Sequence, residues 1–251
     1  SAMSFTITAT FNPSLFSRTC LSVVVLPAPE RPYILLICVD DLRPELGCYG
    51  AEHVQSPNID RLAREGILFT DGHCGASTCT PTRYGLLTGR HNWRSWLKYS
   101  ALSTSAPLLI EEDRVTVASF LKSAGYATSI VGKWHLGYGR EEGFENNRGN
   151  TPPNYWETQG KGPDWNGVLK PGPRENGFDY SYVIPVANSF PPYVFVENHH
   201  VAGLRKESPI GKLESRNYGK MEGGEGARAA GSLEHTSALQ AQGWDGKHGP
   251  A

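Results

Sequence analysis

The sequence lacks any apolar run close to the ~20 residues that a transmembrane helix requires, so no membrane-spanning segment is expected. It also lacks a charge excess, because 24 Lys and Arg residues stand against 25 Asp and Glu residues, for a formal net charge of -1. Nucleic acids and anionic membranes select strongly basic proteins or patches. The composition therefore excludes a general attraction to either partner, and an anionic substrate must be met by local charges.

Cysteine is also scarce, and a chain of 251 residues can bury a core without disulfide staples. The five cysteines are odd in number and irregularly spaced, which argues against a disulfide framework. The paired short spacings of structural zinc sites are missing as well. A zinc site formed by His73, Cys74, Cys79 and His91 is therefore not expected.

What the sequence does contain is an alternation of predicted strands and helices. The apolar run Tyr33–Val39 has the length and β-branched content of a strand buried on both faces. A helix capped by Ser56 and stopped by Gly66 then leads to a short strand, Ile67–Thr70. This alternation predicts an α/β fold with a mainly parallel sheet sandwiched by helices.

The pattern recurs between residues 117 and 131. Apolar residues at i, i+3, i+4 and i+7 predict a helix with one buried face, formed by Val117, Phe120, Leu121 and Ala124. Gly125 ends this helix, and Tyr126–Val131 follows as a second buried strand. Ligands of such sheets bind beyond the carboxyl ends of the strands, so Asp40, Asp41 and the segment after Val131 are expected on one rim.

Composition divides the chain into three predicted segments: a leader or irregular segment at 1–31, a folded domain at 32–210, and a biased, disordered tail at 211–251. Ser1-Ala2-Met3 looks like an expression scar ahead of a start methionine. Leu21–Leu26, followed by Pro27, faintly resembles the apolar core and end of a signal peptide. We therefore expect a periplasmic or secreted location.

The most informative stretch is residues 77–89, STCTPTRYGLLTG. Thr78 or Cys79 can cap a helix whose early turn holds Pro81, and a helix amino end offers free N–H groups and a positive dipole end to an anion. Arg83 lies four residues after Cys79 and projects from the same helical face. The alternative is a buried, inert cysteine at a helix start.

Two further clusters carry charged groups. Lys133 and His135 follow a strand and can point to the same side in extended geometry, where an ammonium would clamp an anionic oxygen and an imidazole would move protons. Asp40 and Asp41 end a strand, and adjacent carboxylates suit a hard divalent cation. A solvated Lys–His pair and a loop-capping acid pair are the alternatives.

Together these motifs resemble the formylglycine-dependent sulfatases. Residues 77–89 fit the first signature of that family, C-x-P-x-R, and residues 125–135 (GYATSIVGKWH) look like the second. Both follow the Asp-Asp strand end and residues 57–63 (PNIDRLA) in the order of the family. The match runs from about Pro32 to Leu204, which makes residues 32–210 a sulfatase-like catalytic domain. The resemblance implies an alkaline-phosphatase-like α/β/α fold, incomplete on its C-terminal side.

The resemblance also implies a catalytic role for each matching residue. Cys79 would be converted to formylglycine by a formylglycine-generating enzyme, and its hydrate would attack the sulfur of a small-molecule or carbohydrate sulfate ester. Arg83 would fix the formylglycine and offset charge. Lys133 would bind sulfate and the nucleophile. His135 would hydrogen-bond the second hydroxyl and help to expel sulfate.

A metal site is implied in the same way. Asp40, Asp41 and the converted Cys79 would hold calcium, or magnesium in its place, which would polarise the sulfate oxygens. Calcium usually takes about 6–8 oxygen ligands, so this donor set is incomplete. A thiol is a soft ligand and a poor partner for calcium, which would explain the conversion of Cys79.

Other residues expected in the family have no counterpart here, namely a second catalytic histidine, a second lysine and an acid-plus-asparagine pair. His199 and His200 receive no catalytic role, and His235 and His248 lie in the biased tail. We therefore expect the amino-terminal part of a sulfatase domain joined to an unrelated tail, with an exposed sheet edge and uncovered apolar surface. A phosphodiesterase or phosphonate monoester hydrolase, and an inactive fragment, are the alternatives.

Aromatic residues offer one more hypothesis, a pocket for a sulfated sugar. Packing in the core and loops is the interpretation we favour, because large aromatics dominate cores. The residues concerned are His91, Trp93, Arg94, Trp96 and the loop Trp156–Trp165.

Overall fold

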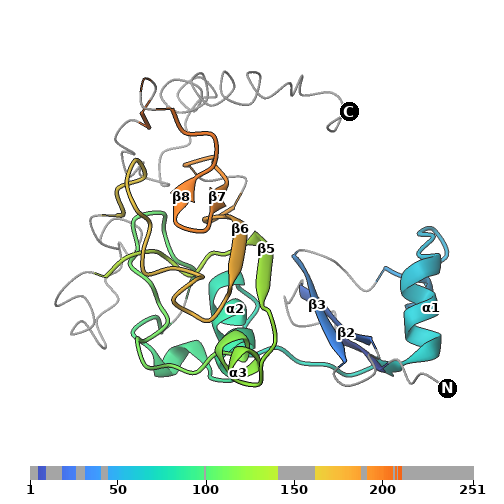
Figure 1. The fold of residues 1–251 in the computed structure, drawn as a ribbon. Coiled ribbons are helices and arrows are strands. Elements are labelled where there is room, and N and C mark those ends of the chain that lie inside the picture. Colours follow the sequence, from blue (N-terminus) through green and yellow to red (C-terminus); the bar gives the residue numbers. More distant parts are fainter. Residues whose placement is uncertain are drawn as a thin grey trace. The chain divides into compact units, whose positions relative to one another are not determined.

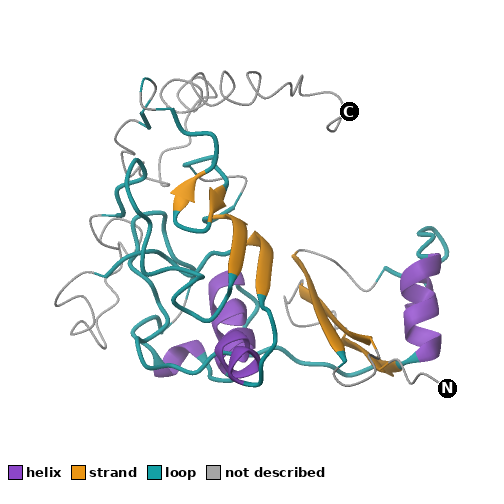
Figure 2. Cartoon of the chain, viewed as in Figure 1, coloured by secondary structure: helices purple, strands orange, loops and turns teal. Residues whose placement is uncertain are grey.

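The structure is a computed structural model, and it describes residues 5–9, 19–26, 32–40, 45–98, 100–140, 162–187, 191–205, 207 and 209–210. The chain divides into two units, residues 1–82 and 83–251, and the border falls inside helix α2, Cys79–Thr88 (Figure 1). Each unit contains a sheet and at least part of a helix (Figure 2). None of the helices in these ranges is long and apolar enough to cross a bilayer.

The first unit is built on a sheet of order β3-β2-β1-β4. Its strands are β1 (Phe5–Ala9), β2 (Thr19–Leu26), β3 (Tyr33–Asp40) and β4 (Ile67–Phe69). β2 pairs antiparallel with β1 and with the whole of β3, and β1 pairs parallel with β4. Strands therefore occur within residues 1–31, where we expected a leader or irregular chain. The β-branched run of β2 explains why that segment takes strand geometry.

The burial of β3 differs from the prediction. Its bounds agree, but the expected burial on both faces is wrong, because Tyr33 is 68% exposed and Leu35 is 50% exposed. Helix α1 (Pro57–Glu65) packs on β1 and β4, at the other end of the sheet order. Within the described residues β3 is thus an edge strand, far in the sheet order from the covering helix.

The bounds of α1 follow from residues that begin and end helices: Ser56 precedes the first turn, Pro57 starts it, and Gly66 follows the last residue. Ser56 does not cap the backbone of the helix directly. Its hydroxyl accepts a hydrogen bond from the Gly47 N–H and donates one to the Asp60 carboxylate, each at 2.9 Å. These bonds fasten the short 3-10 helix η1 (Gly47–Tyr49) to α1.

The second unit contains a sheet of order β5-β6-β7-β8. Its strands are β5 (Ser129–Lys133), β6 (Tyr180–Ile184), β7 (Val196–Glu197) and β8 (His200–Val201). β5 and β6 are parallel, and the other two pairings are antiparallel. The described strands therefore form mixed sheets, where the sequence predicted mainly parallel pairing. Residues 141–161, which include most of the loop Trp156–Trp165, lie outside the described residues.

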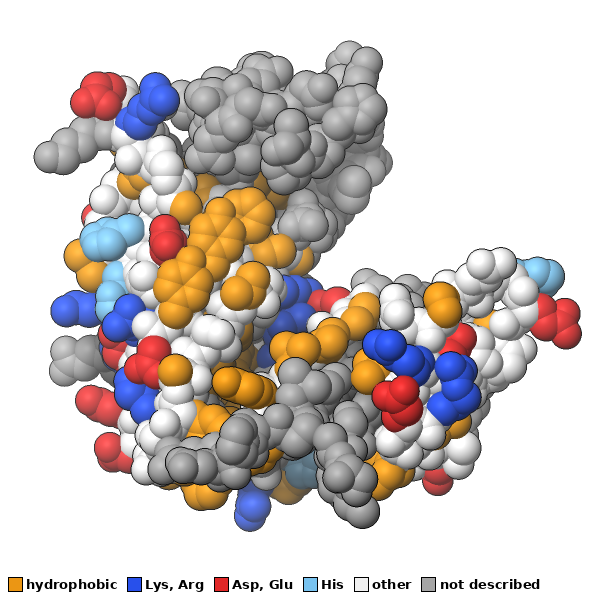
Figure 3. Space-filling view, turned by 45° about the vertical axis from the view of Figure 1, so that its right-hand side comes forward, with side chains coloured by type: hydrophobic (Ala, Val, Ile, Leu, Met, Phe, Trp, Pro, Cys, Tyr) orange, Lys and Arg blue, Asp and Glu red, His pale blue; other side chains and the backbone are white. Residues whose placement is uncertain are grey.

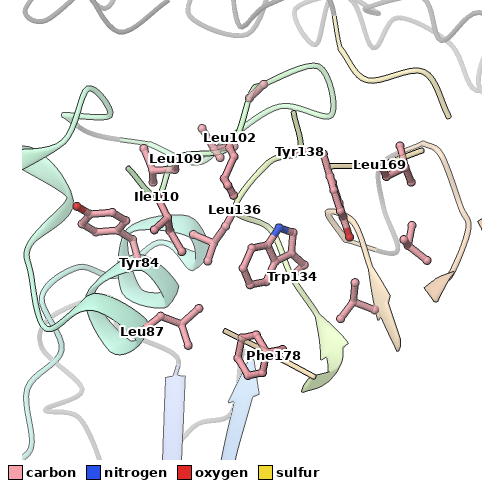
Figure 4. Close-up of a cluster of buried hydrophobic side chains, with 14 of the residues drawn as sticks. Tyr84, Leu87, Leu102, Leu109, Ile110, Trp134, Leu136, Tyr138, Leu169 and Phe178 are labelled. Atoms are coloured by element: carbon pink, nitrogen blue, oxygen red, sulfur yellow. The ribbon is translucent and has the colours of Figure 1, made fainter. Parts of the chain in front are cut away.

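The main hydrophobic core lies in this unit, around the segment that follows β5 (Figure 4). Trp134, Leu136 and Tyr138 point into it and pack with side chains of residues 102–110 and of α2. Gly137 makes the close approach possible: its φ is +80°, and a Cβ there would lie 2.2 Å from the Pro107 carbonyl oxygen. Residues directly after β5 are thus held rigidly by packing on both sides.

Helix α3 (Val117–Ser123) forms where predicted, but the side predicted to be buried is wrong. Phe120 is 62% exposed, whereas Ala118 is 2% exposed. The reason is a close backbone approach, since a Cβ on Gly177 would meet the Ser119 nitrogen at 2.3 Å. Apolar side chains consequently remain on the surface of the molecule, where Figure 3 shows them in orange.

Candidate functional site

Cys79 is the first residue of α2 and is half-buried. The Thr82 N–H donates to the Thr78 carbonyl at 3.1 Å and closes the first helical turn. Below this turn, the Thr82 hydroxyl and the Cys74 thiol both donate to the Ala76 carbonyl at 2.6 Å. The helix start predicted from the sequence is therefore confirmed. Hydrogen bonds within the preceding loop fix the position of this helix start. Cys79 is half-buried, whereas the alternative interpretation expects a buried cysteine.

Arg83 and Lys133, two predicted site residues fifty positions apart, are in contact. Arg83 projects from α2, and its guanidinium Nη1 donates to the Lys133 carbonyl oxygen at 2.6 Å. Lys133 is the last residue of β5. A charge-assisted hydrogen bond of this kind is about twice as strong as a neutral one. It joins the helix that begins with Cys79 to the carboxyl end of β5.

The chain keeps its place beside β6 after β5 ends. The Trp134 N–H donates to the Ile184 carbonyl and the His135 N–H to the Pro185 carbonyl, each at 2.9 Å. His135 itself has a left-handed φ of 52°. The extended geometry expected from Lys133 to His135 is therefore wrong, because the strand ends at Lys133 and the backbone turns at His135.

His135 is held in a defined tautomer. Its ring is only 3% exposed, and Nε2 lies 2.9 Å from the Leu102 carbonyl oxygen. A carbonyl oxygen can only accept a hydrogen bond, so Nε2 carries the hydrogen. In the neutral ring Nδ1 is then the basic nitrogen. No sequence pattern indicates Leu102, because the group that orients the ring belongs to the backbone.

A partly buried set of hydrogen bonds fixes the far end of α2. The hydroxyl of Tyr84 donates to Glu111 at 2.9 Å, and Arg90 donates to the same carboxylate at 2.7 Å. Burial, followed by the hydrogen bond to Glu111, raises the pKa of Tyr84 above 10.0. Burial acts to raise the pKa of Glu111 too, but hydrogen bonds from its own backbone and from Tyr84, and the charge of Arg114, bring it below 4.5.

The predicted metal ligands are only partly described. Asp40 is the exposed last residue of β3, and Asp41 lies outside the described residues. Among the residues that the structure describes, no three or more His, Cys, Asp and Glu side chains gather as a metal-binding group. The calcium or magnesium site therefore stays a prediction.

The aromatic residues proposed for a sugar pocket separate into two groups. Trp165 is buried in the core and Trp96 packs against it, as the core interpretation predicts. Trp93 differs, because it is 54% exposed and its ring stacks with that of His91. Trp156 lies outside the described residues.

The structure describes two of the four remaining histidines that the sequence analysis singles out. His199, in the turn between β7 and β8, contacts the Glu175 carboxylate at 2.8 Å. His200 is exposed at the start of β8. His235 and His248 lie outside the described residues.

Comparison with known proteins identifies the family of the chain. Residues 32–183 match the family model described as Sulfatase. The N-acetylgalactosamine-6-O-sulfatase of Bacteroides thetaiotaomicron is 43% identical over 182 residues, which are 72% of this chain and 32% of that protein. Arylsulfatase A of Bos taurus is 43% identical over 132 residues, 52% of this chain and 26% of that protein.

A solved structure is similar as well. It comes from work on the metabolism of multiple glycosaminoglycans by Bacteroides thetaiotaomicron, and it matches with a TM-score of 0.55 and 42% identity over 66% of this chain and 30% of that one. The chain thus spans between about a quarter and a third of the length of these relatives.

Proposed function

Because the chain belongs to the sulfatase family and has the α/β fold of that family, we propose that it carries the nucleophile-bearing part of a sulfuric ester hydrolase. The observation that supports this most directly is the 2.6 Å hydrogen bond from Arg83 to the Lys133 carbonyl. It brings the helix of the first sulfatase signature into contact with the strand of the second. Arg83 of the first motif and Lys133 of the second are therefore in contact, although they lie fifty positions apart in the sequence.

Cys79 is proposed to act after conversion to formylglycine. The change from a thiol to an aldehyde is an oxidation, so it requires an external oxidant and a formylglycine-generating enzyme as partner. Once converted, Cys79 would supply a hydroxyl nucleophile for the ester sulfur and a second hydroxyl whose proton must be removed for sulfate to leave. The half-buried position of Cys79 at a fastened helix start suits a group that must meet both enzyme and substrate.

The other residues would offset the negative charge of the sulfate or accept a proton. The guanidinium of Arg83 and the ammonium of Lys133 would offset the negative charge of the sulfate, a role that works best with groups fixed before the reaction. His135 would take the proton of the second hydroxyl at Nδ1, because its Nε2 hydrogen points to the Leu102 carbonyl. The buried ring cannot rotate without losing that bond.

Asp40 and Asp41 are proposed as ligands of calcium, or of magnesium. Carboxylates at a strand end fit a hard cation, and the exposed position of Asp40 leaves it accessible. The ion would act as a Lewis acid toward the sulfate oxygens. The thiol of Cys79 does not suit this cation, so we expect binding to strengthen when Cys79 is converted.

We propose a carbohydrate sulfate ester as the substrate class, since the N-acetylgalactosamine-6-O-sulfatase relative is 43% identical over 72% of this chain. A chromogenic aryl sulfate is the convenient probe. An aryl phosphate diester at the same concentration tests the phosphodiesterase alternative.

The deciding experiment combines mass spectrometry and turnover. After co-expression with a formylglycine-generating enzyme, the peptide that contains Cys79 should show the aldehyde, and the protein should release the aryl alcohol. Cys79→Ala should abolish turnover. Cys48→Ala is the matched control, because Cys48 is also half-buried and its backbone N–H, which donates to Asp60 at 2.7 Å, is kept in the variant. An unmodified Cys79, or turnover that survives Cys79→Ala, would contradict the proposal.

A periplasmic or secreted location is proposed on the apolar run Leu21–Leu26. In the structure this run belongs to β2, which pairs with β3 over its full length. Amino-terminal sequencing of exported protein is the test. Export with residues 19–26 retained would show that this run is not removed as a leader.

A further inference from the structure

An exposed aromatic stack lies outside the residues proposed for catalysis. The 3-10 helix η2 (Asn92–Arg94) follows α2 and presents Trp93, which is 54% exposed. The ring of His91 stacks on that of Trp93 with centroids 5.6 Å apart and planes 13° apart. The guanidinium of Arg94 lies 5.6 Å from the centroid of the same ring. Aromatic and cationic groups are thus combined on one small area of surface.

The turn that carries this stack is fastened from within. Asn92 is buried, and its amide donates to the Leu97 and Lys98 carbonyls at 2.9 and 3.1 Å. Ser95 is buried too, and its hydroxyl donates to the Asn92 carbonyl and accepts from the Leu97 N–H. A binding group on a rigid turn loses little freedom when a ligand arrives. Trp93 is therefore a preorganised contact.

The segment of chain that carries the stack has charged residues of one sign only. No Asp or Glu occurs from Gly72 to Ile110, although the chain contains 25 of them. Arg90 of this stretch is engaged by Glu111, but no ion pair in the described part of the chain involves Arg94 or Lys98. The Lys98 ammonium donates to the Trp93 and Ser95 carbonyls, both at 2.9 Å, which holds it close to the backbone of the stack.

We propose that His91, Trp93, Arg94 and Lys98 form a docking site for a sulfated polysaccharide, separate from the residues that would act on the ester. The C–H face of a sugar packs on an aromatic ring, and a planar guanidinium binds the oxygens of an oxyanion in pairs. An ammonium adds a second point charge. The name of the ligand rests on the proposed function, whereas its anionic and ring-stacking character follows from these four side chains.

The position of the site suits a polymer. Cys79 begins α2 and η2 follows the end of α2, and a helix of 10 residues is about 15 Å long. A polysaccharide held at η2 would extend over several sugar units before its ester reached the helix start. A single-stranded nucleic acid is the less suitable occupant, because proteins that bind single strands stack successive bases on several aromatic side chains, whereas η2 presents a single exposed indole, that of Trp93.

The test measures binding without turnover. The full chain carrying Cys79→Ala is titrated into a fluorescently labelled, 6-sulfated chondroitin oligosaccharide at low salt, with anisotropy as readout. Adding Trp93→Ala or Arg94→Gln should weaken binding about five- to tenfold, the usual effect of losing an aromatic or arginine anchor. Phe120→Ala and Arg174→Gln are the matched controls, because Phe120 is 62% exposed and Arg174 is exposed on the same unit. Both controls should bind as the parent does.

Three outcomes would overturn the docking site: no binding of the sulfated chain, equal affinity in the η2 variants and the controls, or equally tight binding of unsulfated chondroitin or single-stranded DNA. Melting temperatures show whether each variant is folded. Neither conversion of Cys79 nor turnover enters the measurement. Failure of the proposed catalytic function therefore appears as absent turnover with intact binding, and failure of the docking site as lost binding with intact turnover.

Discussion

At the scale of single residues, the contact between His135 and the Leu102 carbonyl determines which ring nitrogen can take a proton. Nε2 is committed as a donor at 2.9 Å, which leaves Nδ1 as the basic atom of the neutral ring. Two substitutions of His135 separate its structural role from its role in proton transfer. Glutamine can place an amide nitrogen near the Nε2 position and keep the bond to Leu102, whereas asparagine places its amide near Nδ1 and loses that bond.

We predict that His135→Gln melts within a few degrees of the parent but turns over an aryl sulfate ~10²–10⁴-fold more slowly, the usual effect of removing a general base. His135→Asn should lose comparable activity and also melt at a lower temperature. The measurement is kcat on formylglycine-containing protein together with a thermal melt. Full activity in His135→Gln would show that Nδ1 moves no proton in the reaction.

A second residue-scale prediction concerns Glu111, whose carboxylate binds Tyr84 and Arg90 at the end of α2. Its pKa lies below 4.5, so the stability it contributes is present above pH 4.5 and is lost as the pH falls through the lower folded value. Glu111→Gln should cost about 1–2 kcal/mol in the free energy of unfolding at pH 7. It should also make the acid loss of stability shallower, as measured by urea unfolding between pH 7 and pH 3.

Tyr84 provides the opposite pH check. Its pKa is raised above 10.0 in the folded protein, so the stability of the neutral hydroxyl is present below pH 10 and is lost as the pH rises through the folded value. Tyr84→Phe should remove the loss of unfolding free energy at alkaline pH and should leave the loss at acid pH mostly unchanged. An acid limb unchanged in Glu111→Gln would contradict the role of the carboxylate.

At the scale of elements, one ion pair joins the last turn of α3 to the start of β6. Lys122 Nζ lies 2.6 Å from Asp179, and the Thr128 N–H donates to the same carboxylate at 3.0 Å. The bond from Lys122, followed by that from Thr128, lowers the pKa of Asp179 from 3.8 to about 2. The stability that this pair contributes is therefore present above pH 3.8 and disappears as the pH falls toward 2.

We predict that Asp179→Asn lowers the melting temperature at pH 6 and that the difference from the parent narrows at pH 2.5. Asparagine can still accept from the Thr128 N–H, so the loss measures the charge of Asp179. Lys122→Gln is the matched variant and should show the same pH dependence, because it removes the other half of the pair. A difference that stays constant with pH would exclude the ion pair as its cause.

The elements also show what the sequence could and could not predict. The bounds of α1 and β3 follow from Pro57, Gly66 and the apolar run of β3, which are local features. The side on which α3 is buried does not follow from its apolar period, because Gly177 approaches Ser119, which follows the buried Ala118. Periodicity identifies an apolar face, but a distant segment decides which face is covered.

The candidate site divides in the same way. The residue types and motifs of Arg83 and Lys133 predict that both side chains offset the negative charge of a sulfate. Their actual link runs through the backbone carbonyl of Lys133, and His135 is oriented by the carbonyl of Leu102. Any residue has a carbonyl group, so its use leaves no pattern in the sequence.

At the scale of the whole molecule, the second unit carries an apolar sheet face. Along β5 and β6 the side chains alternate, which places Val131 opposite Tyr182 in register, and Val131 is 72% exposed. Tyr182 stacks with Phe195 at 5.1 Å, and Phe195 is 41% exposed. The uncovered apolar surface expected from the sequence is therefore found among the described residues. Contiguous apolar patches of this kind promote association.

We predict that the chain on its own binds an apolar dye and self-associates as its concentration rises, and that Val131→Thr with Phe195→Thr reduces both. Threonine keeps strand propensity, and exposed positions usually change the unfolding free energy by less than about 0.5 kcal/mol, so the fold should survive. Phe120→Thr removes a ring on α3 that is more exposed, at 62%, than that of Phe195 and serves as control. Sedimentation velocity over a range of concentrations separates the cases. Association that falls equally in the control would reflect general surface hydrophobicity, and association that persists in the double variant would place the contact elsewhere than on this sheet face.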